Sequence, residues 1–146
     1  MNTLLRFTAV ILLLGATTVQ GIAQIKDVKF ESVKFQKIID KSLVPSLESD
    51  IPGIVDGSIY NIVLCKKYFS SLNFTTANAK LKWVIAENAS PSLCYKAHLA
   101  LIYLEHADEI TIAPVSKAES TDYIFRQISD ELKAKMLVIS GSIVQK

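Results

Sequence analysis

The chain has 146 residues, of which half are hydrophobic, and its 16 Lys and Arg nearly balance its 14 Asp and Glu. These charges are scattered rather than clustered, which argues against the basic surface that nucleic-acid binding requires, so we expect no nucleic-acid partner. No segment reaches the roughly 20 apolar residues of a membrane-spanning helix, so we expect a soluble protein.

The first 23 residues have the layout of a secretory signal peptide. Arg6 precedes the apolar run FTAVILLLGA, and small residues surround Gly21 and Ala23. The run is too short to span a bilayer, and small residues suit cleavage by signal peptidase. We therefore expect residues 1–23 to be a signal peptide and residues 24–146 to form a single domain. The mature protein would be secreted or periplasmic, with no membrane partner after signal cleavage.

The next part of the chain is typical of amphipathic helices separated by short breakers. In FQKIIDKSLVPSLES, apolar residues recur at helical spacing, and Pro45 is expected to kink or end the helix. In SDIPGIVDGSIYNIVLCKKYF, Pro52 suits a first helical turn, and the pattern predicts a helix that is buried over much of its circumference. Gly53 and Gly57 lie one turn apart. Because glycine weakens a helix interior, we interpret them as close packing against a neighbouring helix, the alternative being close approach of a partner or ligand.

Two further helices are predicted before residue 110. NFTTANAKLKWVIAEN predicts the third helix, with Thr75 or Thr76 as its N-cap. Ser90 followed by Pro91 is a strong start signal for the fourth. A short break, extended through residues 110–112, is expected to follow the fourth helix.

The last helix is predicted from a capping box and an apolar stripe. Ser116 and Glu119 have the S-x-x-E pattern, and Gly141 is expected to end the helix. The stripe, which we expect to pack over the fourth helix and close the domain, consists of Phe125, Ile128, Leu132, Met136 and Ile139. The whole pattern predicts an all-α fold of about five helices in antiparallel hairpins, as a short stack or an irregular bundle.

The stretch SPSLCYKAHLALIYLEHADE, residues 90–109, contains the residue types of metal and catalytic sites. On a helical wheel, one narrow polar sector of an otherwise apolar helix holds Cys94, His98, Glu105 and Glu109. Cys94 and His98 have the i, i+4 spacing of two metal ligands, but Glu105 lies about 16 Å beyond Cys94 along the axis. We interpret the sector as a solvated strip. We expect no metal, no cofactor and no catalytic centre, and thus no enzyme.

In an exported protein, two cysteines can form a disulfide and an Asn-x-Thr motif can be glycosylated. In successive hairpins the second and fourth helices run parallel, which would place Cys65 and Cys94 roughly 12 Å apart, beyond disulfide reach. We expect both thiols to be free. Asn73 begins Asn-Phe-Thr in a predicted loop and is a possible glycosylation site; otherwise it is a polar loop residue.

Two blocks of the chain resemble known helical proteins. IPGIVDGSIYNIVLCKKYF and SPSLCYKAHLALIYL resemble consecutive helices of HEAT-like α-helical repeat proteins, and they are similar to small exported bacterial proteins of unassigned function. The resemblance covers residues 34–107, and the spacing from Pro52 to Pro91 is near the HEAT repeat length. It implies a helical scaffold without a catalytic centre, and it transfers no functional residues.

The leading functional expectation is a non-catalytic module for protein–protein interaction, or a scaffold, with an unknown protein partner. Stacked helices form extended surfaces for this purpose. The candidate binding residues are His98, Glu105 and Glu109. Three aromatic side chains are further candidates only if they are not buried, and burial is the stronger expectation for Tyr60, Tyr68 and Trp83.

The alternative function is a carrier of a small apolar ligand. Helical bundles hold such ligands in cavities between their helices. A carrier would need a cavity of a few hundred cubic ångströms lined by Ile59, Ile62, Leu81 and Leu101.

Overall fold

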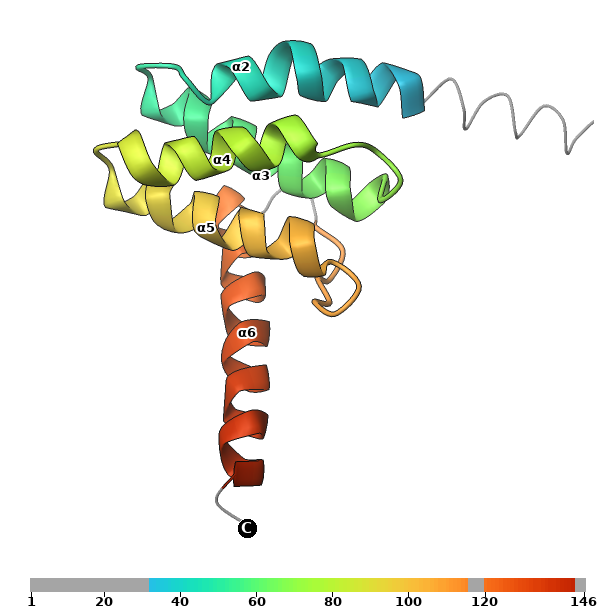
Figure 1. Cartoon of the computed structure of the whole chain (residues 1–146), viewed down its shortest axis with the longest axis vertical. Helices are drawn as coiled ribbons and strands as arrows, with labels where there is room; N and C mark the ends of the chain where they lie inside the picture. The colour runs from blue at the N-terminus through green and yellow to red at the C-terminus, as the bar shows by residue number, and fades with distance from the viewer. Residues whose placement is uncertain (1–31, 116–119, 144–146) are drawn as a thin grey trace, which may run out of the picture. The chain divides into compact units, whose positions relative to one another are not determined.

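The computed structural model describes residues 32–115 and 120–143, with side chains up to residue 137, and every regular element in these ranges is a helix (Figure 1). Residues 32–38 are α-helical. The elements that follow are η1 (Ile39–Leu43), α2 (Val44–Ser46), α3 (Pro52–Tyr68), α4 (Thr75–Glu87), α5 (Pro91–His106) and α6 (Thr121–Ile143). The expected all-α fold is confirmed. The expected signal peptide and the capping box at 116–119 lie outside the described residues.

Pro45 is accommodated by a change of helical pitch in the turn before it. Proline has no N–H, and its ring collides with the carbonyl group four residues earlier in an α-helix. The π-helical η1 precedes Pro45, and at its end Val44 N–H donates to the carbonyl of Ile39, five residues back. The wider π-turn relieves the clash. The helix then ends at Ser46, as the proline predicts.

The start of α3 agrees with the sequence, but its two glycines do not have the predicted role. Pro52 occupies the first turn. An ideal Cβ at Gly53 or Gly57 would meet no atom of another described element within 4 Å. The interpretation as close helix packing is therefore wrong, and the open space offers no contact that requires glycine.

Gly57→Ala is expected to raise the free energy of unfolding by about 0.5–1 kcal/mol, since alanine is about that much more favourable in a helix interior and the added methyl group meets nothing. Urea unfolding followed by circular dichroism measures the change. A loss of stability would mean that a surface outside the described residues covers this face of α3.

α5 is the central helix, since it packs against α4, α3 and the first turns of α6. Its start is as predicted: Pro91 is in the first turn and Ser90 Oγ accepts a hydrogen bond from Leu93 N–H at 3.5 Å. The N-cap of α4 is Phe74 rather than a threonine. The fully buried large side chains of the bundle are Ile39, Leu47, Val55, Ile59, Ile62, Val63, Leu81, Val84, Ile124 and Ile128.

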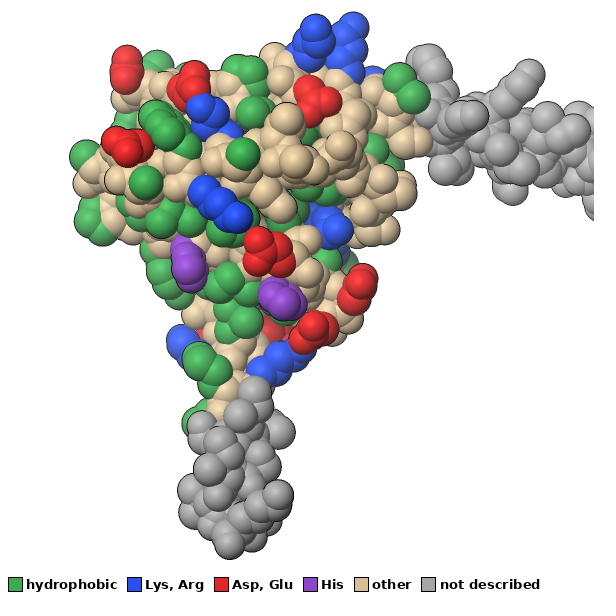
Figure 2. All heavy atoms as spheres, viewed as in Figure 1, with side chains coloured by type: hydrophobic (Ala, Val, Ile, Leu, Met, Phe, Trp, Pro, Cys, Tyr) green, Lys and Arg blue, Asp and Glu red, His purple; other side chains and the backbone are tan. Residues whose placement is uncertain are grey.

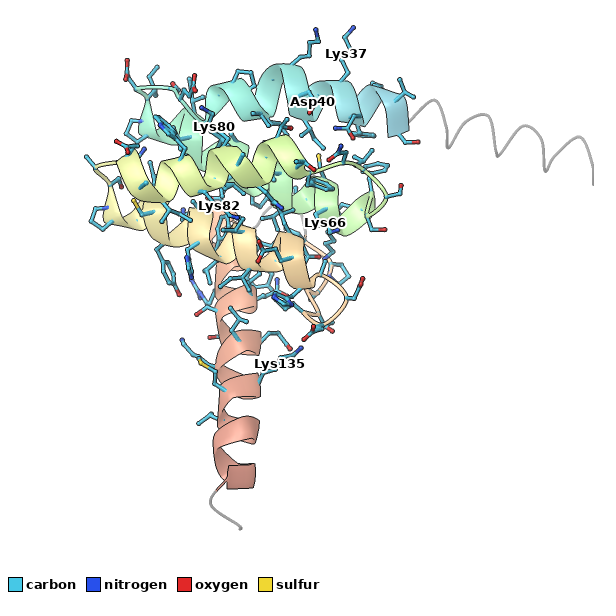
Figure 3. All side chains as sticks on the ribbon, in the orientation of Figure 1. Lys37, Asp40, Lys66, Lys80, Lys82 and Lys135 are labelled. Atoms are coloured by element: carbon cyan, nitrogen blue, oxygen red, sulfur yellow. The ribbon has the colours of Figure 1, made fainter. Side chains whose placement is uncertain are left out.

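Polar contacts join residues 36–48 to α4. Asp40 accepts hydrogen bonds from Gln36 Nε2 and from Thr76 Oγ1, each at 3.0 Å. Lys80 on α4 forms an ion pair with Glu48. Figure 3 shows Asp40 and Lys80 on these two neighbouring helices.

Both cysteines are free, as predicted. Burial raises the pKa of the Cys65 thiol, which reduces its reactivity at neutral pH. The Cys94 thiol donates to the carbonyl of Asn88 at 3.2 Å and approaches that of Val84 at 3.6 Å. It therefore holds the connection between α4 and α5.

Among the described side chains of α6, the buried apolar ones all lie in its first half. Ile124, Phe125 and Ile128 are buried, Leu132 is half-buried, and Met136 is 59% exposed. Figure 1 shows the reason: α6 crosses α5 instead of running along it, so only its first turns meet the bundle. The expectation that the whole stripe covers the fourth helix is wrong.

The far end of α6 also differs from the prediction. The helix continues through residue 141 to Ile143, so the expected stop at Gly141 is wrong. The side chain of Ile139 lies outside the described set. No described helix is both long enough and apolar enough to cross a membrane.

Candidate functional site

The three predicted binding residues do not form one site. His98 and Glu105 are exposed on α5 and lie about 10 Å apart along its axis, whereas Glu109 follows the end of the helix at His106. Figure 2 shows the two histidines as separate patches. The predicted strip thus has no common focus for a ligand.

Glu109 is instead part of a small charged contact with α6. Its carboxylate lies 3.4 Å from His106 Nδ1 and 3.6 Å from Lys135 Nζ. The hydrogen bond with His106 and the charge of Lys135 lower the pKa of Glu109. All three side chains are exposed, so this contact contributes little to stability.

No metal centre is found in the part of the chain that the structure describes. It contains no group of three or more His, Cys, Asp or Glu side chains placed to hold an ion. Cys94 and His98 have the i, i+4 spacing of two metal ligands. The Cys94 thiol instead contacts backbone carbonyl groups where α4 connects to α5.

Sequence reasoning missed an ionic cluster around Lys96, which we call the Lys96 clamp. Lys96 Nζ lies 2.6 Å from Asp56 on α3 and 2.5 Å from Asp122 on α6. Asp56 also accepts a hydrogen bond from Thr121 Oγ1 at 3.0 Å, and Lys96 Nζ lies 5.5 Å from the centre of the Phe125 ring. The clamp therefore joins three helices at the base of α6.

The clamp shifts the pKa values of Lys96 and Asp122. Burial alone lowers the pKa of Lys96, but hydrogen bonds and charge attraction from Asp122 and Asp56 outweigh burial and raise it. The hydrogen bond from Lys96 lowers the pKa of Asp122. A lysine held in its charged form by two carboxylates is suited to structural bridging and not to proton abstraction.

Two surface clefts accompany these contacts, and both are lined by polar and apolar side chains together. One of about 410 Å³ lies between α5 and α6, where Tyr95 OH donates to Ser129 Oγ at 3.0 Å. The other, of about 330 Å³, lies beside Trp83 and includes the carboxylates of Asp50 and Glu87. Neither is lined by the residues proposed for a ligand cavity, of which Ile59, Ile62 and Leu81 are fully buried.

Two of the three aromatic residues expected in the core are exposed. Tyr68 and Trp83 reach the surface, so the prediction of burial is wrong for them, and Tyr60 is half-buried. Lysine side chains lie over both exposed rings: Lys67 Nζ is 5.5 Å from the Tyr68 ring centre, and Lys80 Nζ is 4.6 Å from that of Trp83. Such contacts shield part of each ring.

Asn73 is exposed in the loop between α3 and α4, where it was predicted to lie. Its Oδ1 accepts a hydrogen bond from Thr75 N–H at 2.9 Å, and its own N–H donates to Gln36 Oε1 at 2.8 Å. These bonds give Asn73 a role in shaping the loop. Glycosylation at this residue stays a prediction.

An exposed apolar surface lies on the second half of α6, where the sequence predicted that the stripe would be covered. We call it the tip surface: Leu132, Met136 and Leu137, with Lys133 and Lys135. Met136 is 59% exposed and Leu137 is 73% exposed. Figure 3 shows Lys135 on this part of α6, where the helix has left the bundle.

Comparison of the chain with protein-family models, with curated proteins and with solved structures finds no match. Function is therefore inferred from the surfaces described above.

Proposed function

We propose that this chain is an exported, non-catalytic interaction module that docks onto another macromolecular surface through the tip surface of α6. The observation that supports this proposal is the exposure of Met136 and Leu137 on a helix that is amphipathic along its length. Large apolar side chains that are grouped on a surface mark interaction sites more often than isolated ones do.

The architecture suits such a role because it separates a rigid base from a protruding contact element. Ile124, Phe125 and Ile128 anchor the first half of α6 in the core, and the Lys96 clamp ties the same end to α3 and α5. The base therefore fixes the direction of α6, while the second half remains available for contact. Neither of the two clefts is lined by the residues expected for an apolar-ligand cavity, so neither favours the alternative function as a carrier.

Site-specific photo-cross-linking tests the proposal against the surface first expected from the sequence. The photoreactive residue p-benzoylphenylalanine is placed at position 137, at position 98 in the α5 strip, or at position 54, where Ile54 is an exposed apolar residue on α3. We expect defined adducts in native cells from position 137 and none from positions 98 and 54.

The three positions give distinguishable answers. Adducts from position 98 alone would show that the binding surface is the predicted α5 strip, which includes His98 and Glu105. An absence of adducts from position 137, in a protein that is folded by circular dichroism, would overturn the proposed function of the tip surface.

A further inference from the structure

The charge of the α6 tip has one sign. From Leu132 to the end of the chain the sequence is LKAKMLVISGSIVQK, which contains three lysines and no aspartate or glutamate. The last acidic residue before it is Glu131. A surface that is both apolar and cationic is complementary to a surface that is apolar beneath an anionic layer.

The two described lysines of the tip lie next to its apolar side chains. At 100° per residue and with Leu132 as zero, Met136 lies at about 40° and Leu137 at about 140°, with Lys133 between them at about 100°. Lys135 lies about 60° from Leu132 on the other side. Long lysine side chains beside apolar residues keep the ammonium group at a headgroup layer while their methylene groups lie along apolar surface.

These lysines are only weakly engaged within the protein. Lys133 Nζ is 3.5 Å from Asp130, and Lys135 Nζ is 3.6 Å from Glu109, and each of the four side chains is 40% or more exposed. Exposed pairs of this kind contribute little and exchange readily. Both ammonium groups are therefore available to another anion.

A second copy of the chain fits this surface poorly in a parallel pair. Pairing two tips side by side in parallel would place Lys133 near Lys133 and Lys135 near Lys135, and the tip surface as defined has no acidic side chain to compensate. A narrow groove on a protein would cover one face, yet Met136 and Leu137 are both exposed and lie about 100° apart around the helix.

We infer that the tip surface binds an anionic lipid surface, with the second half of α6 lying in the plane of the headgroup layer. This inference rests on the proposed function and names the kind of surface that α6 contacts. The inference departs from the expectation of no membrane partner after signal cleavage, which was drawn from the lack of a second apolar stretch of spanning length. An amphipathic helix that lies on the surface needs no spanning length.

The test uses tryptophan as a local reporter in the full-length chain, so that lipid contact elsewhere does not affect the reading. Trp83 is the only tryptophan and is replaced in a Trp83→Phe background. Leu137→Trp then reports on the tip, and Ile54→Trp reports on an exposed site of α3. Each protein is titrated with vesicles of phosphatidylcholine, alone or mixed with phosphatidylglycerol, and with brominated lipids as quenchers.

We expect the emission of tryptophan at position 137 to shift to the blue and to be quenched by brominated lipid in the phosphatidylglycerol vesicles, while that at position 54 is unchanged. Lys133→Gln with Lys135→Gln should raise the lipid concentration for half-maximal shift about tenfold or more. The matched control is Lys37→Gln with Lys41→Gln, which replaces two exposed lysines of the first helix. Figure 3 shows Lys37 pointing away from the bundle. This control should leave the titration unchanged.

Three outcomes would overturn the inference. The first is no shift at position 137 with either vesicle, and the second is an equal shift with both vesicles that the lysine substitutions do not affect. The third is a shift that depends on protein concentration without lipid, which would identify a second copy as the occupant. If cross-linking at position 137 still captures a protein in any of these cases, the proposed interaction function stands. Only the inference that the tip surface binds anionic lipid is then wrong.

Discussion

Replacing Ile128 by alanine is expected to lower the free energy of unfolding by about 2–5 kcal/mol, because a fully buried isoleucine loses its transfer energy and leaves a cavity. Ile128 is the last fully buried residue among the described side chains of the α6 stripe, so it carries much of the packing that anchors the helix. Urea denaturation followed by circular dichroism gives the change.

The matched control lies on the same stripe. Met136→Ala should change the free energy of unfolding by no more than about 0.5 kcal/mol, because that side chain is mostly exposed. Similar losses for Ile128→Ala and Met136→Ala would show that the second half of α6 is covered in solution, contrary to the structure.

Lys96→Met is expected to cost about 2–3 kcal/mol at neutral pH. Removing one partner of a buried ion pair typically costs about 3–5 kcal/mol, since the remaining charge is left uncompensated. The side chains of Lys96 and Asp56 are 13% and 22% exposed, so water partly solvates the orphaned carboxylate and reduces the loss. Asp122 is largely exposed and adds little to this cost.

A second substitution separates the charge effect from lost packing. Asp56→Asn in the Lys96→Met background removes the uncompensated charge and keeps an acceptor for Thr121 Oγ1, so it should restore part of the stability. If the double variant is as unstable as the two single losses added together, the clamp does not act as a charge pair.

The effect of Lys96→Met should depend on pH in a defined direction. The lowered pKa of Asp122 contributes stability above the ordinary aspartate range, about pH 3.9, and that contribution is lost as the pH falls through the lowered value. The raised pKa of Lys96 contributes stability below the ordinary lysine value of about 10.4, and it is lost as the pH rises through the raised value. The difference between wild type and variant should therefore be largest near neutrality and shrink at both extremes.

Local signals in the sequence account for much of the fold. Ser90 with Pro91 marks the start of α5, and Pro45 marks the end of the first helix within one residue, because both effects depend on the backbone chemistry of a few neighbours. The two glycines of α3 show the limit of such signals. Their spacing suggested a contact, but contact depends on where the next helix lies, which the local sequence does not determine.

The candidate site was harder to predict for the same reason. Lys96 and Asp56 are 40 residues apart and have no motif in common, so their pairing follows only from the tertiary packing of α3 and α5. Glu109 was assigned to the helical strip because no glycine or proline marks the end of α5 at His106. The apolar stripe of α6 was visible in the sequence, but periodicity alone does not tell which of its turns meet the bundle.

The Lys96 clamp holds α6 at one end only, so a small tilt at that end becomes a larger displacement at the other. At 1.5 Å per residue, Ile143 lies about 22 Å beyond Ile128, so a tilt of about 10° at the anchored end moves the far end by about 4 Å. That distance is comparable to the depth at which an interfacial helix lies in a lipid layer. Small rearrangements of Asp56, Lys96 and Asp122 would thereby be magnified at the tip. If the tip binds lipid as proposed, these three residues would help to set how deeply α6 lies in the lipid layer without touching it.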